Sequence, residues 1–392
     1  LPESQIEQAA QTAKEQQTDG WIITLKAPSY IPFMTYADDR ELRKQLYMAY
    51  NTQCTHDNAH NNFEIVKRIV NLRREVAQLL GYASYADFAL KNRMAEKPEH
   101  VYQLLNDLIK HYKVPAEKEM KAISALSDEE LKPWDFAYYS QKLKKKEFDL
   151  DAEMLRPYFE LSQVKKGIFG LAERLYGITF KQNPDIPVYH PDVEAFEVID
   201  ENGDFLAVLY CDFHPRKGKQ SGAWMTNYKE ESERDGRPFV AIVMNLTKPT
   251  AEKPALLTLG EVETFLHEFG HALHGIFAKT RYAALSGTSV YWDFVELPSQ
   301  FMENYAVEKE FLSTFAKHYK TGEPIPDELL AKIRKSRNFN VAYACMRQVS
   351  FGLLDMAYYT QTEPFTEDVR AFEQKAWAPA QLMPQEPETC MS

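Results

Sequence analysis

The amino-acid sequence predicts a mainly α-helical protein with one small β-sheet inserted near the middle of the chain. Two observations carry this prediction. Apolar residues recur every three or four positions through about the first 180 residues and again after Pro254, and strand-like runs are confined to the segment between. We therefore expect a helical region over residues 1–177 and a catalytic region over 178–392, with a sheet at 178–250 and helices at 258–392.

The first region contains four expected helices, each marked by apolar residues at helical spacing. They lie at 1–20, 63–80, 101–126 and 136–150. Gly81 directly follows the second of them and is a typical helix stop. The lysine-rich run at 142–146 is interpreted as a solvated helix face.

The middle of the chain carries the strand signals. The runs 193–200 and 205–211 flank an Asn202-Gly203 turn, which is typical of a β-hairpin, and 238–246 is a third expected strand. Residues 210–224 are expected to form a solvated loop between strands. The alternative is that Tyr210 and the basic run 216–219 contribute positive charge near a peptide carboxylate. The helical pattern then returns at 258–279, 298–319, 326–360 and 367–376.

Charge and cysteine usage exclude several classes of protein. The net charge of −11 argues against a nucleic-acid partner, which would require a basic face. The longest nearly apolar run, 239–246, is far too short to span a membrane. Four scattered cysteines without a Cys-x-x-Cys pair argue against a disulfide scaffold and suggest a reducing compartment. We therefore expect no nucleic acid, no membrane association and a cytoplasmic location.

One pentapeptide carries recognisable chemistry: His267-Glu268-Phe269-Gly270-His271, a His-Glu-x-x-His motif. On a helix, positions i and i+4 lie on the same face, so the two imidazoles can ligate one metal ion. Glu268, the residue after the first histidine, is directed away from the face shared by the two imidazoles. It can therefore act as a general base on a water molecule without ligating the ion. Apolar neighbours, among them Phe269 and Phe277, indicate a buried helix. The alternative is a surface helix whose histidines have no function.

A catalytic zinc ion needs a third protein ligand, and spacing alone leaves three candidates. They are Asp293, Glu296 and Glu303. Glu263 lies one turn before His267 and could accept a ring N–H from a ligating histidine. An ordinary exposed glutamate is an equally good interpretation of Glu263.

Further stretches along the chain follow a known pattern. They lie at 20–21, 148–150, 157–161, 185–192, 221–224, 278–288 and 293–300. Together with the pentapeptide and Glu263, they resemble the thimet-oligopeptidase family of zinc metallopeptidases, and more narrowly its bacterial peptidyl-dipeptidases. The resemblance covers essentially the whole chain.

This resemblance implies a set of residue roles. Glu296 would be the third ligand of one zinc ion per chain, beside His267 and His271. Glu263 would support the ligands, and Asp293 and Glu303 would be supporting or structural residues. A loop formed by Ser286, Gly287 and Thr288 would close over a substrate. A plain connecting turn is the alternative for this loop.

The resemblance also implies an activity. We expect a monomeric, multi-helical peptidase with a deep channel that releases C-terminal dipeptides from short peptides, with Glu268 as the base. The alternatives are an oligo-endopeptidase of the same family and a non-catalytic, metal-bearing peptide-binding protein. Intact Glu268 argues against the last, since a site that only holds metal has no need of that carboxylate.

Members of the family are longer than this chain at both ends. The resemblance therefore implies that the chain is a fragment, and that the tyrosine and histidine residues that stabilise the oxyanion lie beyond Ser392. Loss of one oxyanion donor costs roughly 10²–10³ in rate, so we expect the chain alone to be severely impaired.

Overall fold

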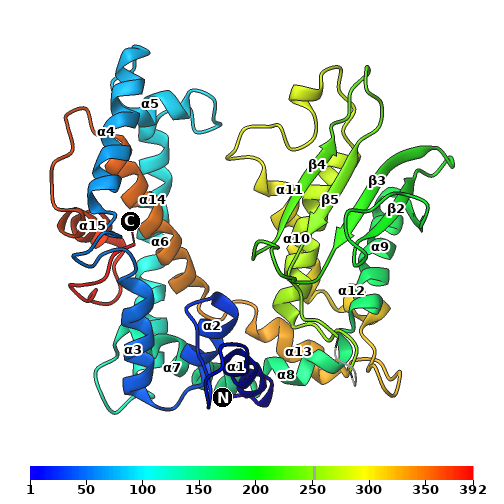
Figure 1. Cartoon of the computed structure of the whole chain (residues 1–392), viewed down its shortest axis with the longest axis horizontal. Helices are drawn as coiled ribbons and strands as arrows, with labels where there is room; N and C mark the ends of the chain where they lie inside the picture. Colours follow the sequence, from blue (N-terminus) through cyan, green and yellow to red (C-terminus); the bar gives the residue numbers. More distant parts are fainter. Residues whose placement is uncertain (250–252, 392) are drawn as a thin grey trace. The chain divides into compact units, whose positions relative to one another are not determined.

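The computed structural model describes residues 1–249 and 253–391 and confirms a mainly helical chain with one small sheet (Figure 1). The chain folds into two compact units, Leu150–Arg337 and a second built from Leu1–Asp149 with Asn338–Ser392. These bounds differ from the regions 1–177 and 178–392, because the C-terminal helices pack against the N-terminal ones. None of the described helices is long and apolar enough to cross a membrane.

The discontinuous unit is entirely helical. Its elements are α1 (Glu3–Glu15), α2 (Ala27–Tyr36), α3 (Arg40–Asn51), α4 (Phe63–Leu79), α5 (Tyr85–Leu90), α6 (Pro98–Ser124), the 3-10 turn η1 (Pro133–Asp135), α7 (Phe136–Phe148), α14 (Val341–Tyr359), α15 (Val369–Trp377) and η5 (Ala378–Ala380). The four helices expected in the first region are confirmed as α1, α4, α6 and α7. Gly81, just past α4, has φ +85°, as a glycine stop requires.

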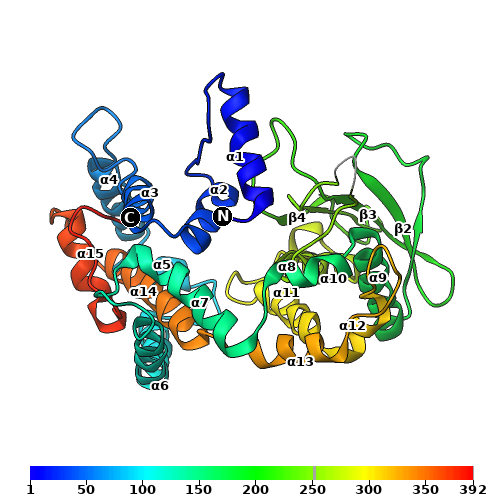
Figure 2. The same ribbon diagram turned by 90° about the horizontal axis from the view of Figure 1, so that it is seen from below.

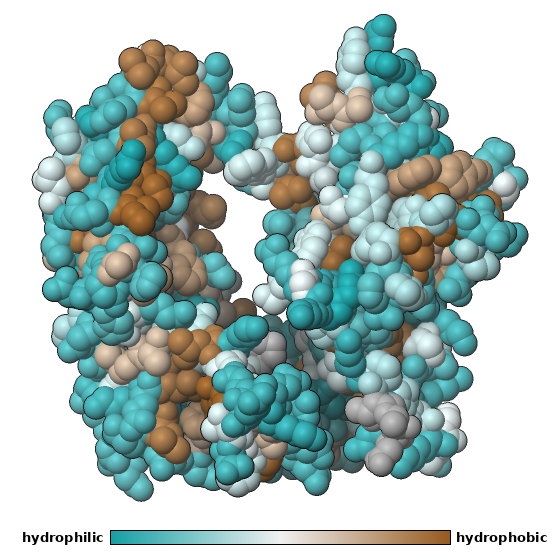
Figure 3. All heavy atoms as spheres, in the orientation of Figure 1, coloured by the Kyte–Doolittle hydropathy of each residue, from teal (hydrophilic) through white to brown (hydrophobic). Residues whose placement is uncertain are grey.

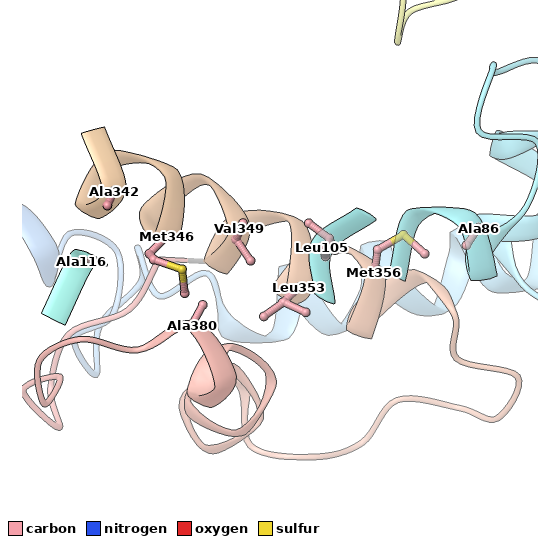
Figure 4. Close-up of a cluster of buried hydrophobic side chains, with 9 residues drawn as sticks. All are labelled: Ala86, Leu105, Ala116, Ala342, Met346, Val349, Leu353, Met356 and Ala380. Carbon is pink, nitrogen blue, oxygen red and sulfur yellow. The ribbon is translucent and has the colours of Figure 1, made fainter. Parts of the chain in front are cut away.

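Helices α6 and α14 form the spine of this unit, although more than 200 residues separate them in the sequence. Their facing side chains belong to one buried apolar cluster, which contains Leu105 of α6 and Met346, Val349 and Leu353 of α14 (Figure 4). A second cluster joins α4 and α15 to the other side of α14 through Val70, Leu354 and Phe372 among others.

The continuous unit contains the sheet and the motif helix. Its elements are α8 (Ala152–Leu155), η2 (Arg156–Tyr158), α9 (Leu161–Tyr176), β1 (Thr179–Gln182), β2 (Glu194–Ile199), β3 (Phe205–Asp212), β4 (Trp224–Lys229), β5 (Phe239–Val243), α10 (Leu259–Ile276), η3 (Ala283–Leu285), α11 (Glu296–Glu303), η4 (Asn304–Val307), α12 (Lys309–Phe315) and α13 (Asp327–Ser336).

The five strands lie in the order β1-β2-β3-β5-β4. The predicted hairpin is confirmed as β2 and β3, and only the β3–β5 pair is parallel. Helix α10 packs on β5 and β4, and α9 packs on β1 (Figures 1 and 2). The helix that carries the His-Glu-x-x-His motif therefore packs against the sheet.

Several sequence-based expectations were wrong in detail. Strands β1 and β4 were missed, and the expected helix at 298–319 is divided into α11, η4 and α12. The expected helix at 326–360 is divided at Asn340, whose φ of +57° lies in the left-handed region.

The expectation of a solvated 210–224 loop was wrong for Lys219. Asp212 accepts hydrogen bonds from Arg216 at 2.7 Å and from Lys219 at 2.8 Å, and the Arg216 side chain is still 20% exposed. The Lys219 side chain is only 3% exposed.

Candidate metal centre

Helix α10 is fixed at its N-terminus by a capping box. The hydroxyl of Thr258 accepts a hydrogen bond from the Glu261 backbone N–H at 3.1 Å, and the Glu261 carboxylate accepts from the Thr258 N–H at 2.8 Å. The same carboxylate accepts from the backbone N–H of Thr247, which follows β5. The start of the motif helix is thereby tied to the end of the central sheet.

The buried faces of α10 hold the motif in place. Leu266 and Phe269 are fully buried and Leu273 nearly so, as the sequence indicated. Phe277 departs from that expectation, because it caps the C-terminus and is 40% exposed. The motif thus lies on a well-packed section of helix that ends just past it.

Gly270 allows α11 to cross α10 at very short range. A Cβ atom at this position would lie 2.6 Å from both the carbonyl oxygen of Pro298 and the Cα of Ser299. Because moving those backbone atoms would displace α11, only glycine permits this close crossing. The crossing places Glu296, the first residue of α11, beside the two motif histidines.

Three side chains converge at this crossing. One carboxylate oxygen of Glu296, Oε2, lies 3.2 Å from Nε2 of His267 and 3.1 Å from Nε2 of His271. One ligand atom from each of the three residues lies within 4.8 Å of the others. Two imidazole nitrogens and a carboxylate oxygen are the donor set of a common type of catalytic zinc site, so the residues present fit this metal.

Hydrogen bonds and burial hold these groups in ligand-competent states. The buried hydroxyl of Ser299 donates to Glu296 Oε2 at 2.7 Å. Burial alone would raise the pKa of Glu296, but this hydrogen bond and the two histidines outweigh it and lower the pKa. Burial lowers the pKa of His271, which favours the neutral imidazole that a metal requires.

Glu303 contacts the far side of the His267 ring. Its Oε1 lies 2.6 Å from His267 Nδ1, which leaves Nε2 directed at Glu296. A carboxylate on the second ring nitrogen fixes the orientation of a metal-ligating histidine. From spacing Glu303 was a candidate ligand, and from the resemblance a supporting or structural residue; the structure places it in contact with His267, a contact that the sequence did not specify.

The remaining predicted supporting residues lie close by in the chain. Glu263 is half-buried on α10, one turn before His267, and Asp293 is exposed in the segment that precedes α11. Their predicted supporting roles stay predictions.

Glu268 is not one of the three converging residues. It is 5% exposed, and its Oε2 has no hydrogen-bond partner within the described parts of the chain. Burial raises its pKa to about 7, against the opposing charge of His267 and with a smaller contribution from Glu296. An unpartnered buried carboxylate next to a metal-ligand set is chemically suited to exchange protons with a water molecule.

The predicted substrate loop packs against the motif helix. Ser286 is buried, and Gly287 has φ +52° with its Cβ position 3.1 Å from the Cα of Gly275 in α10. Thr288 is half-buried. The loop therefore lies on the C-terminal half of α10, and contact with a substrate stays a prediction.

Comparison with known proteins gives a consistent result. Residues 33–391 match the model of Peptidase family M3. The chain is 40% identical over 378 residues to oligopeptidase A of Escherichia coli (strain K12), with 93% of the chain and 56% of the relative covered. It is 39% identical over 385 residues to dipeptidyl carboxypeptidase of the same organism, with 96% of the chain and 56% of the relative covered.

A plant relative shows the same pattern of coverage. The probable cytosolic oligopeptidase A of Arabidopsis thaliana is 35% identical over 388 residues, which are 95% of the chain and 55% of that relative. The chain thus spans little more than half the length of the relatives that it matches.

Proposed function

The chain belongs to peptidase family M3, and on this premise we propose that it acts in zinc-dependent hydrolysis of short oligopeptides. The observation that carries the proposal is the convergence of His267, His271 and Glu296 beside the unpartnered carboxylate of Glu268. The first three would hold one zinc ion. A bound zinc ion would supply Lewis acidity toward a water molecule and the scissile carbonyl.

The protein's own groups account for the proton transfers. Glu268 accepts a proton from the attacking water, because its buried carboxylate is unpartnered and its pKa is held near neutrality. The same residue then delivers that proton to the leaving amine. Glu303 keeps the His267 ring oriented throughout through its contact with Nδ1.

The substitution Glu268→Gln tests this assignment. We expect the variant to retain zinc and to lose hydrolysis of an oligopeptide, since the amide cannot accept the proton. Zinc content and cleavage of a quenched fluorescent peptide are measured on the same preparation, with His267→Ala as the control that loses zinc. Undiminished hydrolysis by the Gln variant would refute the role of Glu268.

The substrate mode is proposed to be release of C-terminal dipeptides, as in a peptidyl-dipeptidase. Likeness to dipeptidyl carboxypeptidase at 39% identity supports it. Likeness to oligopeptidase A at 40% identity supports internal cleavage as the second candidate.

A pair of peptides of the same sequence, one with a free C-terminus and one amidated, separates the two modes. A peptidyl-dipeptidase must bind the C-terminal carboxylate of its substrate, so amidation is expected to suppress cleavage. Product masses would then show only dipeptides from the free peptide. Equal cleavage of both peptides at internal bonds would establish the second candidate instead.

We also propose that the protein works in the cytoplasm as a peptide-processing enzyme. Four free cysteines and the likeness to a plant protein named as cytosolic support this location. Fractionation of cells that express a tagged protein tests it, and recovery outside the cytoplasmic fraction would contradict it.

A further inference from the structure

Ser299 is a polar side chain in a fully buried position. The face of the molecule in Figure 3 is mostly hydrophilic, as expected where polar residues lie at the surface. Ser299, in contrast, lies on α11 with 0% of its surface exposed. A buried hydroxyl lowers stability unless it is hydrogen-bonded, so its bonding partner indicates why the residue is there.

The hydroxyl of Ser299 has two acceptors within reach, and both belong to Glu296. The carboxylate oxygen Oε2 lies at 2.7 Å and the backbone carbonyl oxygen at 2.9 Å. A serine hydroxyl donates a single proton, and the charged acceptor at the shorter distance makes the stronger bond. The proton therefore belongs on the side of the carboxylate, the group that contacts Nε2 of His267 and of His271.

Other helical serines of the chain bond to the backbone instead. The hydroxyl of Ser350 in α14 donates to the carbonyl of Arg347 at 2.6 Å, and that of Ser336 in α13 donates to the carbonyl of Ile333 at 3.1 Å. A bond to the carbonyl of the preceding turn is the common local arrangement of a serine within a helix. Ser299 has the same kind of carbonyl within reach, but it also has a carboxylate, which is the better acceptor.

Glu296 is the ligand whose orientation the helices determine least. His267 and His271 project from the middle of the long helix α10, whereas Glu296 is the first residue of the short helix α11. Glutamate also has more side-chain torsions than histidine, so holding it in one rotamer costs more conformational entropy. The hydrogen bond from Ser299 selects the rotamer in which the carboxylate faces the two imidazoles.

The backbone of Ser299 is itself in contact with the motif helix. Its Cα lies 2.6 Å from the position that a Cβ atom on Gly270 would take, and Gly270 directly precedes His271. Helices α10 and α11 lie side by side at this point (Figure 1). The hydroxyl therefore holds the carboxylate of α11 from a point that touches the helix carrying both imidazoles.

We propose that Ser299 is a positioning residue of the metal centre, whose hydroxyl holds the Glu296 carboxylate in the rotamer that faces His267 and His271. This inference rests on the proposed zinc site. Its specific consequence is that the hydroxyl is needed for metal binding rather than for folding. The contact with Gly270 uses the Cα of Ser299, which an alanine would preserve.

Zinc affinity of the whole chain tests the proposal, measured by competition with a chromophoric chelator for wild type, Ser299→Ala and Ser350→Ala. Ser350 is the matched control, because it is also a buried helical serine with a backbone carbonyl within reach. The two variants are expected to shift the urea midpoint of the metal-free chain by similar, small amounts. Only Ser299→Ala is expected to weaken zinc binding, by roughly tenfold.

A double-mutant cycle with Glu296→Ala shows whether the effect passes through the carboxylate. In that background Ser299→Ala is expected to cause no further loss of zinc affinity, since the hydroxyl has no carboxylate left to hold. A further loss of the same size would mean that Ser299 acts on the site by another route, and it would overturn the proposal.

The other outcomes separate this inference from the proposed function. If the wild type binds zinc and Ser299→Ala binds it equally tightly, the positioning role is overturned and the zinc site stands. If the wild type binds no zinc, the proposed function fails and this inference fails with it. Circular dichroism checks the fold of each variant, and a Ser299→Ala chain that unfolds while Ser350→Ala stays folded would also overturn the proposal.

Discussion

At the scale of single residues, the site depends on how each imidazole is oriented. His267 is held between Glu296 on its Nε2 and Glu303 on its Nδ1. His271 contacts Glu296 through its Nε2, but its Nδ1 has no partner among the described residues, so only one side of this ring is held by a carboxylate. The two histidines therefore differ in how strongly their environment fixes them.

Glu303→Gln is expected to weaken zinc affinity by roughly 10–100-fold, because loss of the orienting carboxylate lets the His267 ring turn and lowers its basicity. Competition with a chromophoric chelator measures the affinity. The control Glu310→Gln alters an exposed glutamate of α12 and is expected to change nothing. Equal affinity in wild type and Glu303→Gln would show that the contact has no orienting role.

The motif residues could be predicted from sequence because their geometry is local. His267 and His271 share a face on any helix, whatever surrounds it. The third ligand could not be chosen by spacing, since Asp293, Glu296 and Glu303 are all compatible with it. The choice depends on where α11 crosses α10, which is a property of packing at Gly270.

At the scale of elements, the crossing of α10 and α11 determines whether the site exists. Gly270→Ala is expected to push α11 away, because its Cβ would lie 2.6 Å from backbone atoms of Pro298 and Ser299. We expect a loss of about 1–3 kcal/mol in the free energy of unfolding, together with loss of zinc binding.

A second glycine of α10 is the matched control for that substitution. Gly260 has only the Thr258 hydroxyl near its Cβ position, at 3.9 Å. Gly260→Ala is expected to keep zinc and to be neutral or more stable by up to about 1 kcal/mol, as helix propensity predicts. Urea denaturation and zinc content measure both variants. A fully stable, zinc-binding Gly270→Ala would contradict the role of the crossing.

The segment after β3 is held by a buried ion cluster with a predictable pH dependence. Burial alone would raise the pKa of Asp212, but hydrogen bonds from Arg216, Lys219 and Tyr189 outweigh it and lower the pKa from 3.8 to about 2. The stabilising contribution of a carboxylate with a lowered pKa is complete above its ordinary pKa and is lost as the pH falls through the folded-state pKa.

Asp212→Asn is therefore expected to be less stable than wild type at neutral pH. The difference in free energy of unfolding between the wild type and the variant is expected to decrease as the pH falls from about 4 toward 2, over the range in which the wild type stays folded. Urea midpoints measured across this range test the expectation. A difference that is constant or increases on acidification would contradict it.

Sequence patterns predicted most long elements better than short or edge elements, although the 16-residue helix α9 was not predicted. Helices α4, α6 and α10 have enough turns for their apolar periodicity to be unmistakable, and the β2–β3 hairpin has an Asn-Gly turn. Strand β4 was missed because its residues, Trp224–Lys229, are mostly half-buried and polar, as an edge strand permits. The division of 298–319 was missed because no glycine or proline marks it.

At the scale of the whole molecule, the division of the chain into two units could not be predicted from the order of its elements, because one unit is discontinuous in sequence. Two compact units exist because α14 packs along α6, a contact between segments that no local pattern relates. All the proposed zinc ligands and Glu268 lie in the continuous unit, Leu150–Arg337. The metal centre is therefore built from one continuous stretch of chain. The helical unit, in contrast, is formed by two separate segments, Leu1–Asp149 and Asn338–Ser392.

The central claim is that His267, His271 and Glu296 together hold one zinc ion. The most direct measurement is the zinc content per chain, by mass spectrometry of purified protein after dialysis, for wild type and His271→Ala side by side. We predict one zinc ion per wild-type chain and none retained by the variant. A wild-type chain without zinc, or a variant with the same zinc content, would contradict the claim.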